Sequence, residues 1–133
     1  MRPRVLIADE DDKTLAVAGS LLKEAGMEFV LARTGRSALK AAQNVFDLII
    51  TECEIEFDPA KSPGEKINLL EAYKTACIAT PIVLYTALEH SSVIVSAAGS
   101  QLPLVKQILR KPLALKEPQN FLTAVRATLI VSL

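Results

Sequence analysis

Three carboxylates, one hydroxyl and one lysine stand directly after short apolar runs of the sequence: Asp9, Glu10, Glu52, Thr86 and Lys111. Grouped carboxylates repel one another unless a cation or a proton lies among them. Oxygen ligands of this kind suit Mg²⁺, a hard cation that retains several waters. A lysine facing them can neutralise a carboxylate or hold a phosphoryl oxygen, and a threonine hydroxyl can donate to that same oxygen. The residue types therefore indicate a cation or phosphate site, provided that the fold brings them together.

The apolar runs that precede these residues have the composition of buried β-strands. We predict five of them, at residues 5–8, 29–32, 48–51, 82–85 and 105–109. Helical spacing predicts helices between and after them, at 15–25, after the capping residue Thr34, at 67–77, near 92–98 and from Pro118. Residues 52–65 hold two prolines and a glycine and predict a loop.

Strands separated by helices pair in parallel through right-handed crossovers. The sequence therefore predicts an α/β fold, a doubly wound five-stranded parallel sheet with helices on both faces. In such a sheet, ligands bind beyond the carboxyl ends of the strands. We therefore expect the five residues to converge on one rim. The alternative is that these acids stay solvated or cap the next helix, which we expect of Asp11 and Asp12.

Composition narrows the function classes. The chain of 133 residues has room for a single domain, which we expect to span residues 1–133. Its 15 basic and 15 acidic residues balance, which argues against direct nucleic-acid binding. Cys53 and Cys77 lack the spacing of metal ligands. No apolar run has the length of a signal peptide or a membrane span, so we expect a cytoplasmic protein without membrane contact.

From Arg4 to about Leu129 the sequence resembles the receiver domain of two-component response regulators. The segments that carry the resemblance are residues 5–11, 46–52, 81–87 and 111–112, and their order and spacing are more specific than any one of them. The resemblance implies a flavodoxin-like fold with strand order 2-1-3-4-5.

The resemblance also implies roles for individual residues. In that family the first acids hold Mg²⁺, which makes Asp9 and Glu10 the expected metal ligands here. A backbone carbonyl near Glu54 would join them. Threonine and lysine sense the phosphoryl group in the family, and Thr86 and Lys111 occupy those positions.

Glu52 stands where the family has the aspartate that accepts phosphate from a histidine kinase. Glutamate is longer by one methylene, so its oxygens shift toward the space that a phosphoryl group would fill, and the nucleophile is misplaced for in-line transfer. Its charge is about −1, whereas a phosphoryl group carries roughly −1.5 to −2 at neutral pH. Glu52 can therefore imitate a weak, permanent phosphorylation, or it can simply pair with Lys111 in a switch that no longer moves.

Three functions follow as hypotheses. The first is an atypical receiver, or pseudo-receiver, which is not an enzyme and acts through contacts with a histidine kinase or another signalling protein. Its fourth helix, fifth strand and fifth helix would form the contact face, which could also join two copies in a homodimer. The second is a working Mg²⁺-dependent phosphoreceiver that uses Glu54 or Glu52. The third is a small flavodoxin-like enzyme, which is disfavoured because the sequence has no phosphate-binding glycine loop.

Overall fold

A parallel sheet forms the centre of the molecule. The structure is a computed structural model that describes residues 2–88 and 104–132, so the helix predicted near residues 92–98 lies outside the described residues. The sheet has the order β2-β1-β3-β6-β7, in which all neighbours pair in parallel. Its strands are β1 (Arg4–Ala8), β2 (Glu28–Ala32), β3 (Leu48–Thr51), β6 (Ile82–Thr86) and β7 (Val105–Arg110). Counted along the chain, this is the predicted order 2-1-3-4-5.

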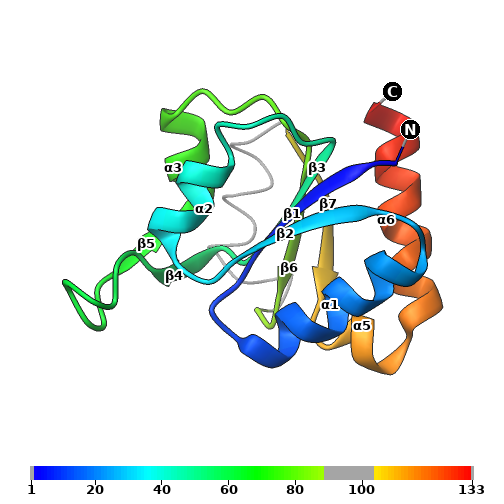
Figure 1. Ribbon diagram of the computed structural model, residues 1–133, viewed down its shortest axis with the longest axis horizontal. Coiled ribbons are helices and arrows are strands. Elements are labelled where there is room, and N and C mark those ends of the chain that lie inside the picture. Colours follow the sequence, from blue (N-terminus) through cyan, green and yellow to red (C-terminus); the bar gives the residue numbers. More distant parts are fainter. Residues whose placement is uncertain (1, 89–103, 133) are drawn as a thin grey trace.

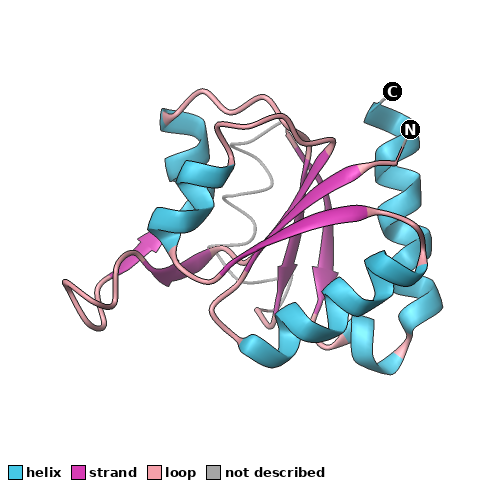
Figure 2. Ribbon diagram, viewed as in Figure 1, coloured by secondary structure: helices cyan, strands magenta, loops and turns pink. Residues whose placement is uncertain are grey.

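Helices cover both faces of this sheet, as predicted (Figures 1 and 2). One face packs against α1 and α6, and the other packs against α2 and α3. The described helices are α1 (Asp12–Glu24), α2 (Gly35–Ala41), α3 (Leu69–Thr75), α5 (Leu113–Lys116) and α6 (Pro118–Ser132). All residues of β3 and β6 are buried because both faces of these central strands are covered, which explains their uninterrupted apolar sequences.

In three of the helices, the side chain of the residue just before the helix accepts a hydrogen bond from a backbone N–H of the first turn. These N–H groups have no acceptor within the helix. Asp11 accepts from the Thr14 N–H, and Asn68 accepts from the Glu71 N–H. Thr34 forms a capping box with Ser37 at the start of α2, which confirms the predicted cap. These contacts set where each helix leaves the rim of the sheet.

The segment predicted as a loop contains a β-hairpin, so that prediction was wrong in part. Strand β4 (Glu54–Glu56) pairs antiparallel with β5 (Lys66–Asn68), and the hairpin projects beside α2 (Figure 1). Ile55 is fully buried while its neighbours are not, the alternation of a half-buried strand. The third helix begins two residues later than predicted, because Ile67 lies in β5 and Asn68 caps the helix.

None of the helices in the described parts of the chain combines enough length and apolar character to cross a membrane.

Candidate functional site

The carboxyl ends of β1, β3, β6 and β7 bring together four of the five residues that the sequence singled out. Glu52 lies at the centre of this group. The Thr86 hydroxyl donates to Glu52 Oε1 over 2.6 Å, and the Lys111 ammonium donates to Glu52 Oε2 over 2.8 Å. The Cys53 backbone N–H adds a bond of 3.1 Å to Oε1. Both oxygens of the glutamate therefore have donors from the chain itself.

Asp9 is the most deeply buried acid of the pocket. Its Oδ2 lies 2.5 Å from Lys111 Nζ, and its Oδ1 accepts the Asp11 N–H over 2.9 Å. Burial raises the pKa of Asp9 above its ordinary value, because the bonds from Lys111 and Asp11 only partly offset the loss of water.

Lys111 is shared between the two acids. Burial disfavours its charged form, but hydrogen bonds to Asp9 and Glu52 outweigh that effect, so the pKa of Lys111 is raised. Burial therefore determines the pKa shift of Asp9, which has one cation beside it. The two carboxyl groups determine the shift of Lys111. The lysine therefore remains charged and serves both carboxyl groups of the pocket formed by Asp9, Glu52 and Lys111.

Glu10 does not join this pocket. Its Oε2 accepts the backbone N–H of Glu56 over 3.1 Å, and its Oε1 accepts from Lys66 Nζ over 3.2 Å. Both donors belong to the β4–β5 hairpin. Glu54, whose carbonyl was expected near a metal, lies in β4 opposite Asn68 with an exposed side chain, and its role remains a prediction.

The donor set as it lies here does not fit Mg²⁺. In residues 2–88 and 104–132, no three acidic, cysteine or histidine side chains come together as a group that could hold a metal ion. A divalent cation beside Asp9 would compete with the Lys111 ammonium for the same oxygens, and Glu10 would have to leave the hairpin to reach it. No catalytic step is therefore assigned to a metal.

Cys53 follows Glu52 and is fully buried. Burial raises the pKa of its thiol to about 11, and the charges of Glu52 and Glu54 act in the same direction. The thiol is therefore protonated at neutral pH and is a poor nucleophile. What Cys53 contributes to the pocket is its backbone N–H.

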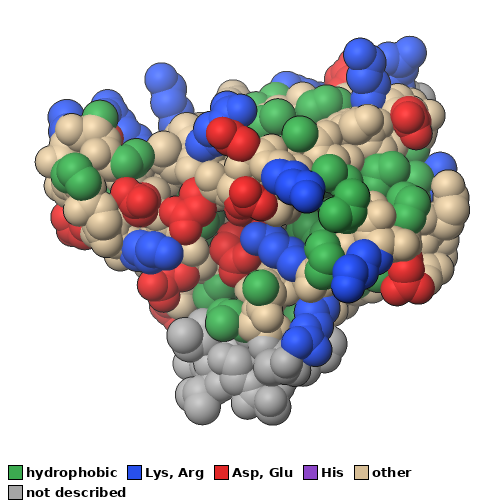
Figure 3. All heavy atoms as spheres, turned by 90° about the horizontal axis from the view of Figure 1, so that it is seen from below, with side chains coloured by type: hydrophobic (Ala, Val, Ile, Leu, Met, Phe, Trp, Pro, Cys, Tyr) green, Lys and Arg blue, Asp and Glu red, His purple; other side chains and the backbone are tan. Residues whose placement is uncertain are grey.

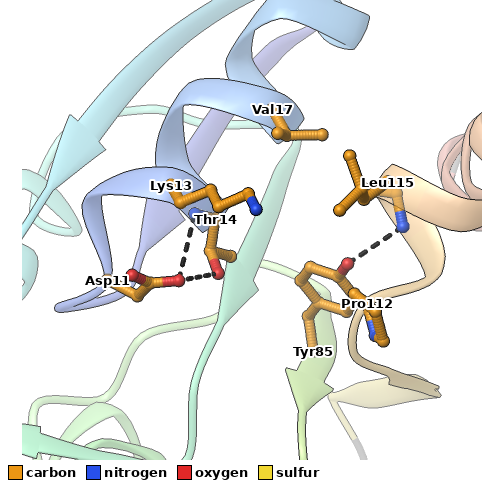
Figure 4. Close-up of a pocket in the computed structure, with 8 residues that line it drawn as sticks. Asp11, Lys13, Thr14, Val17, Tyr85, Pro112 and Leu115 are labelled. Carbon is orange, nitrogen blue, oxygen red and sulfur yellow. Dashed lines mark hydrogen bonds between the residues drawn. The ribbon is translucent and has the colours of Figure 1, made fainter.

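A cavity of about 240 Å³ opens beside the pocket, between the start of α1 and α5 (Figure 4). Its wall is mostly apolar, and its lining residues are Asp11, Lys13, Thr14, Val17, Tyr85, Pro112, Ala114 and Leu115. The Tyr85 hydroxyl accepts the Ala114 N–H over 2.9 Å, and the Tyr85 ring lies 5.9 Å from the Lys111 ammonium. Tyr85 therefore lines the cavity and also lies beside Lys111 of the charged pocket.

Seen from this end of the sheet, acidic side chains lie side by side with lysine and arginine side chains (Figure 3). The contacts pair Lys111 with Asp9 and Glu52, Lys66 with Glu10, and Arg33 with Asp12. These pairs explain how several acids coexist at the rim.

Solved structures of receiver domains share this architecture. CheY4, a chemotaxis response regulator of Vibrio cholerae, matches with a TM-score of 0.72 and 23% identity, over 96% of this chain and 99% of that one. A CheY-like receiver domain protein from Methanospirillum hungatei gives a TM-score of 0.78 and 19% identity, over 99% and 97%. The receiver domain of the Francisella response regulator 1452 gives 0.75 and 22%, over 99% and 100%.

The chain therefore has the receiver-domain fold of two-component response regulators. At these identities the likeness establishes the fold and leaves the chemistry of the pocket to the residues themselves. No protein-family model and no curated protein matches the sequence.

Two contributors to the rim were missed from the sequence, Lys66 and the Glu56 backbone amide. Both lie in the segment predicted as a loop. A signal was present, because polar residues flank Ile55 and also flank Ile67, which is the period-two pattern of a short hairpin. The prolines and the glycine between residues 54–56 and 66–68 nevertheless led to the prediction of a loop.

Proposed function

We propose that this chain is an atypical receiver, a signalling module in which Glu52 holds the switch residues without phosphorylation. The observation that supports it is the pair of bonds from Thr86 and Lys111 to the two oxygens of Glu52, at 2.6 and 2.8 Å. By resemblance to the family, these two residues would contact a phosphoryl group on an aspartate. The longer glutamate side chain reaches them directly.

Bond saturation also opposes phosphoryl transfer to Glu52. Oε1 accepts from Thr86 and Cys53, and Oε2 accepts from Lys111, so an attack on phosphorus would first require at least one of these bonds to break. Charge-assisted bonds such as the one from Lys111 are stronger than neutral ones. Glu52 is therefore a poor nucleophile in this arrangement, and this supports an atypical receiver over a working phosphoreceiver that uses Glu52.

The proposed output is a contact with a signalling protein, a histidine kinase or a partner downstream of one. Output surfaces of receivers respond to the threonine and lysine positions, and here Thr86 ends β6 while Lys111 follows β7. The face that includes β7 and α6 is the proposed contact surface, for a partner or for a second copy.

The test is intact mass spectrometry after incubation with Mg²⁺ and acetyl phosphate. The wild type and a Glu52→Asp variant are treated side by side, and Glu52→Gln serves as the control that lacks a carboxylate at this position. At a Mg²⁺ concentration high enough to draw Glu10 away from the hairpin, we expect a phosphoryl adduct on Glu52→Asp alone, because aspartate withdraws its oxygens by one methylene and leaves room for the donor.

Other outcomes contradict the proposal. An adduct on the wild type would identify a working phosphoreceiver, and peptide mapping would then decide between Glu52 and Glu54. No adduct on any of the three proteins would show that the pocket has lost more than its acceptor, and the idea that Glu52 alone replaces phosphorylation would fail.

A further inference from the structure

The β4–β5 hairpin is fixed in place by several contacts with the start of α2. Gly35, at the start of α2, lies so close to the hairpin that a Cβ placed on it would be 2.8 Å from Ile67 Cδ1 and 3.1 Å from Phe57 Cα. The Arg36 N–H donates to the Phe57 carbonyl over 2.9 Å, and the Arg36 guanidinium lies 3.2 Å from Asp58 Oδ2. The hairpin therefore has a defined position against α2.

From that position the hairpin engages Glu10 through two donors, the Glu56 N–H and the Lys66 ammonium. The bond to Glu10 is the main cause of the raised pKa of Lys66, and the charge of Glu10 adds to it. Glu10 and Lys66 both keep partial access to water, with side chains 36% and 46% exposed. The pair is therefore accessible to exchange with a dissolved ion.

The cations of the rim offset most of the formal charge of its acids. Asp9, Glu10 and Glu52 are three carboxyl groups. Lys111 faces the first and the last of them, and Lys66 faces the second. Two ammonium groups carry the same charge as one divalent cation, so the chain itself supplies the positive charge that grouped carboxylates require.

We propose that Lys66 is a positioning residue that keeps Glu10 on the hairpin and thereby replaces a divalent cation at this rim. Glu10 cannot hold the hairpin and coordinate a metal beside Asp9 at the same time. Hairpin docking and metal binding therefore compete for one carboxylate. This inference concerns metal binding alone and does not depend on the proposed function.

The experiment is a Mg²⁺ titration followed by ¹⁵N–¹H NMR, on the full chain without any phosphodonor. The test variant is Lys66→Met, which keeps an unbranched side chain one atom shorter and removes its charge. The matched control is Lys61→Met, the same substitution at an exposed position in the turn of the same hairpin. The double variant Glu10→Gln/Lys66→Met asks whether Glu10 is the ligand that is released.

We expect Lys66→Met to bind Mg²⁺ on the order of tenfold more tightly than the wild type, because a nearby positive charge is gone and a carboxylate is released. Lys61→Met should stay within about twofold of the wild type, since a distant exposed charge is largely screened. The double variant should return to wild-type affinity. Hydrogen exchange at the Glu56 amide should be faster in both proteins that lack Lys66.

Three results would overturn the inference. Equal Mg²⁺ affinity in the wild type and Lys66→Met would show that Lys66 does not guard Glu10. An equal gain in Lys61→Met would reduce the effect to net charge. A gain that persists in the double variant would place the cation on other ligands. Because no phosphoryl transfer is measured, each of these results is independent of the mass-spectrometry test.

Discussion

Lys111 faces two carboxylates at once, Asp9 at 2.5 Å and Glu52 at 2.8 Å, and its side chain is only 17% exposed. A partly buried ion pair adds little net stability to the fold. Removing one partner is nevertheless strongly destabilising, because it leaves the other charge buried and unpaired. The same lysine also lies near the Tyr85 ring, which provides a further weak attraction. We therefore expect the removal of Lys111 to destabilise the fold more than the removal of either acid.

We predict that Lys111→Met lowers the free energy of unfolding by about 2–4 kcal/mol, because it leaves two partly buried carboxylates without a cation. Glu52→Gln should cost only about 1 kcal/mol, since the amide keeps an acceptor for Thr86 and leaves Asp9 paired with Lys111. Urea unfolding at pH 7, followed by far-ultraviolet circular dichroism, measures both. Equal losses in the two variants would contradict the central role of the lysine.

Asp9 gives a prediction about pH. Its folded pKa is raised above the ordinary 3.8, so folding favours its protonated form. The contribution of Asp9 to stability is then fully present below pH 3.8 and is lost as the pH rises through the raised folded value. Asp9→Asn cannot ionise, so its stability relative to the wild type should increase over that interval.

Urea midpoints of the wild type and Asp9→Asn at matched pH values between about 3.5 and 7 test this sign. Asp12→Asn, at an exposed acid in the first turn of α1, is the control. A difference between Asp9→Asn and the wild type that falls as the pH rises would mean that Lys111 stabilises the Asp9 carboxylate more than burial disfavours it.

At the scale of elements, the hairpin and the start of α2 are fitted to one another at Gly35. Alanine is the better helix former, by about 0.8–1.0 kcal/mol over glycine in a helix interior. Here the added Cβ would lie 3.1 Å from the backbone of Phe57 and 2.8 Å from Ile67, and a backbone atom cannot move aside as a side chain does. Packing and propensity therefore oppose each other at this position.

We predict that packing dominates and that Gly35→Ala destabilises the protein by about 1–3 kcal/mol, the usual cost of an extra group in a filled contact. Gly19→Ala is the matched comparison, because its Cβ would meet the ring of Phe29 at 3.0 Å, and that ring can turn. Thermal unfolding of both variants checks the order. A more stable Gly35→Ala would show that the hairpin position is loosely determined.

The sequence predicted the elements that have a strong local pattern. The continuous apolar runs of β1, β3 and β6 are typical of strands buried on both faces, and Thr34 identified the start of α2. The hairpin was missed because three-residue strands offer too few positions for a period to stand out. Its existence depends on the burial of Ile55 and on contacts with α2, which the local sequence does not encode.

The site also divides into residues whose positions the sequence predicted and contacts that it did not predict. The rule that ligands gather beyond the strand ends placed Asp9, Glu52, Thr86 and Lys111 together, because the position of a strand end fixes the direction of the next residue. It placed Glu10 at the same rim but did not predict its partners, because the longer side chain turns toward the hairpin. The choice of partner for Glu10 required knowledge of the hairpin.

At the scale of the whole molecule, one sheet separates two hydrophobic cores. Successive residues of each central strand point to opposite faces, so Leu6 and Ile49 belong to one core, and Ile7 and Ile50 to the other. A change in either core therefore acts on strands that both cores share.

We predict that Leu22→Ala in α1 and Leu69→Ala in α3 each cost about 2–5 kcal/mol, because each empties space around a fully buried side chain. Both should unfold in a single transition with an unchanged dependence on urea, as expected when one sheet couples the two cores. Leu115→Ala, at a side chain 52% exposed, should change stability by less than about 0.5 kcal/mol. Two separate transitions in either core variant would show that the cores melt independently.

The bonds that Glu52 receives from Thr86, Lys111 and the Cys53 amide come entirely from the chain's own groups. They form when the chain folds, and a phosphatase cannot remove them because they involve no phosphoryl group. A signal carried by such an arrangement has no fast off-switch, so its strength follows the number of molecules and its duration follows their lifetime. Control of this protein would then rest with its synthesis, its degradation and competition for its partner.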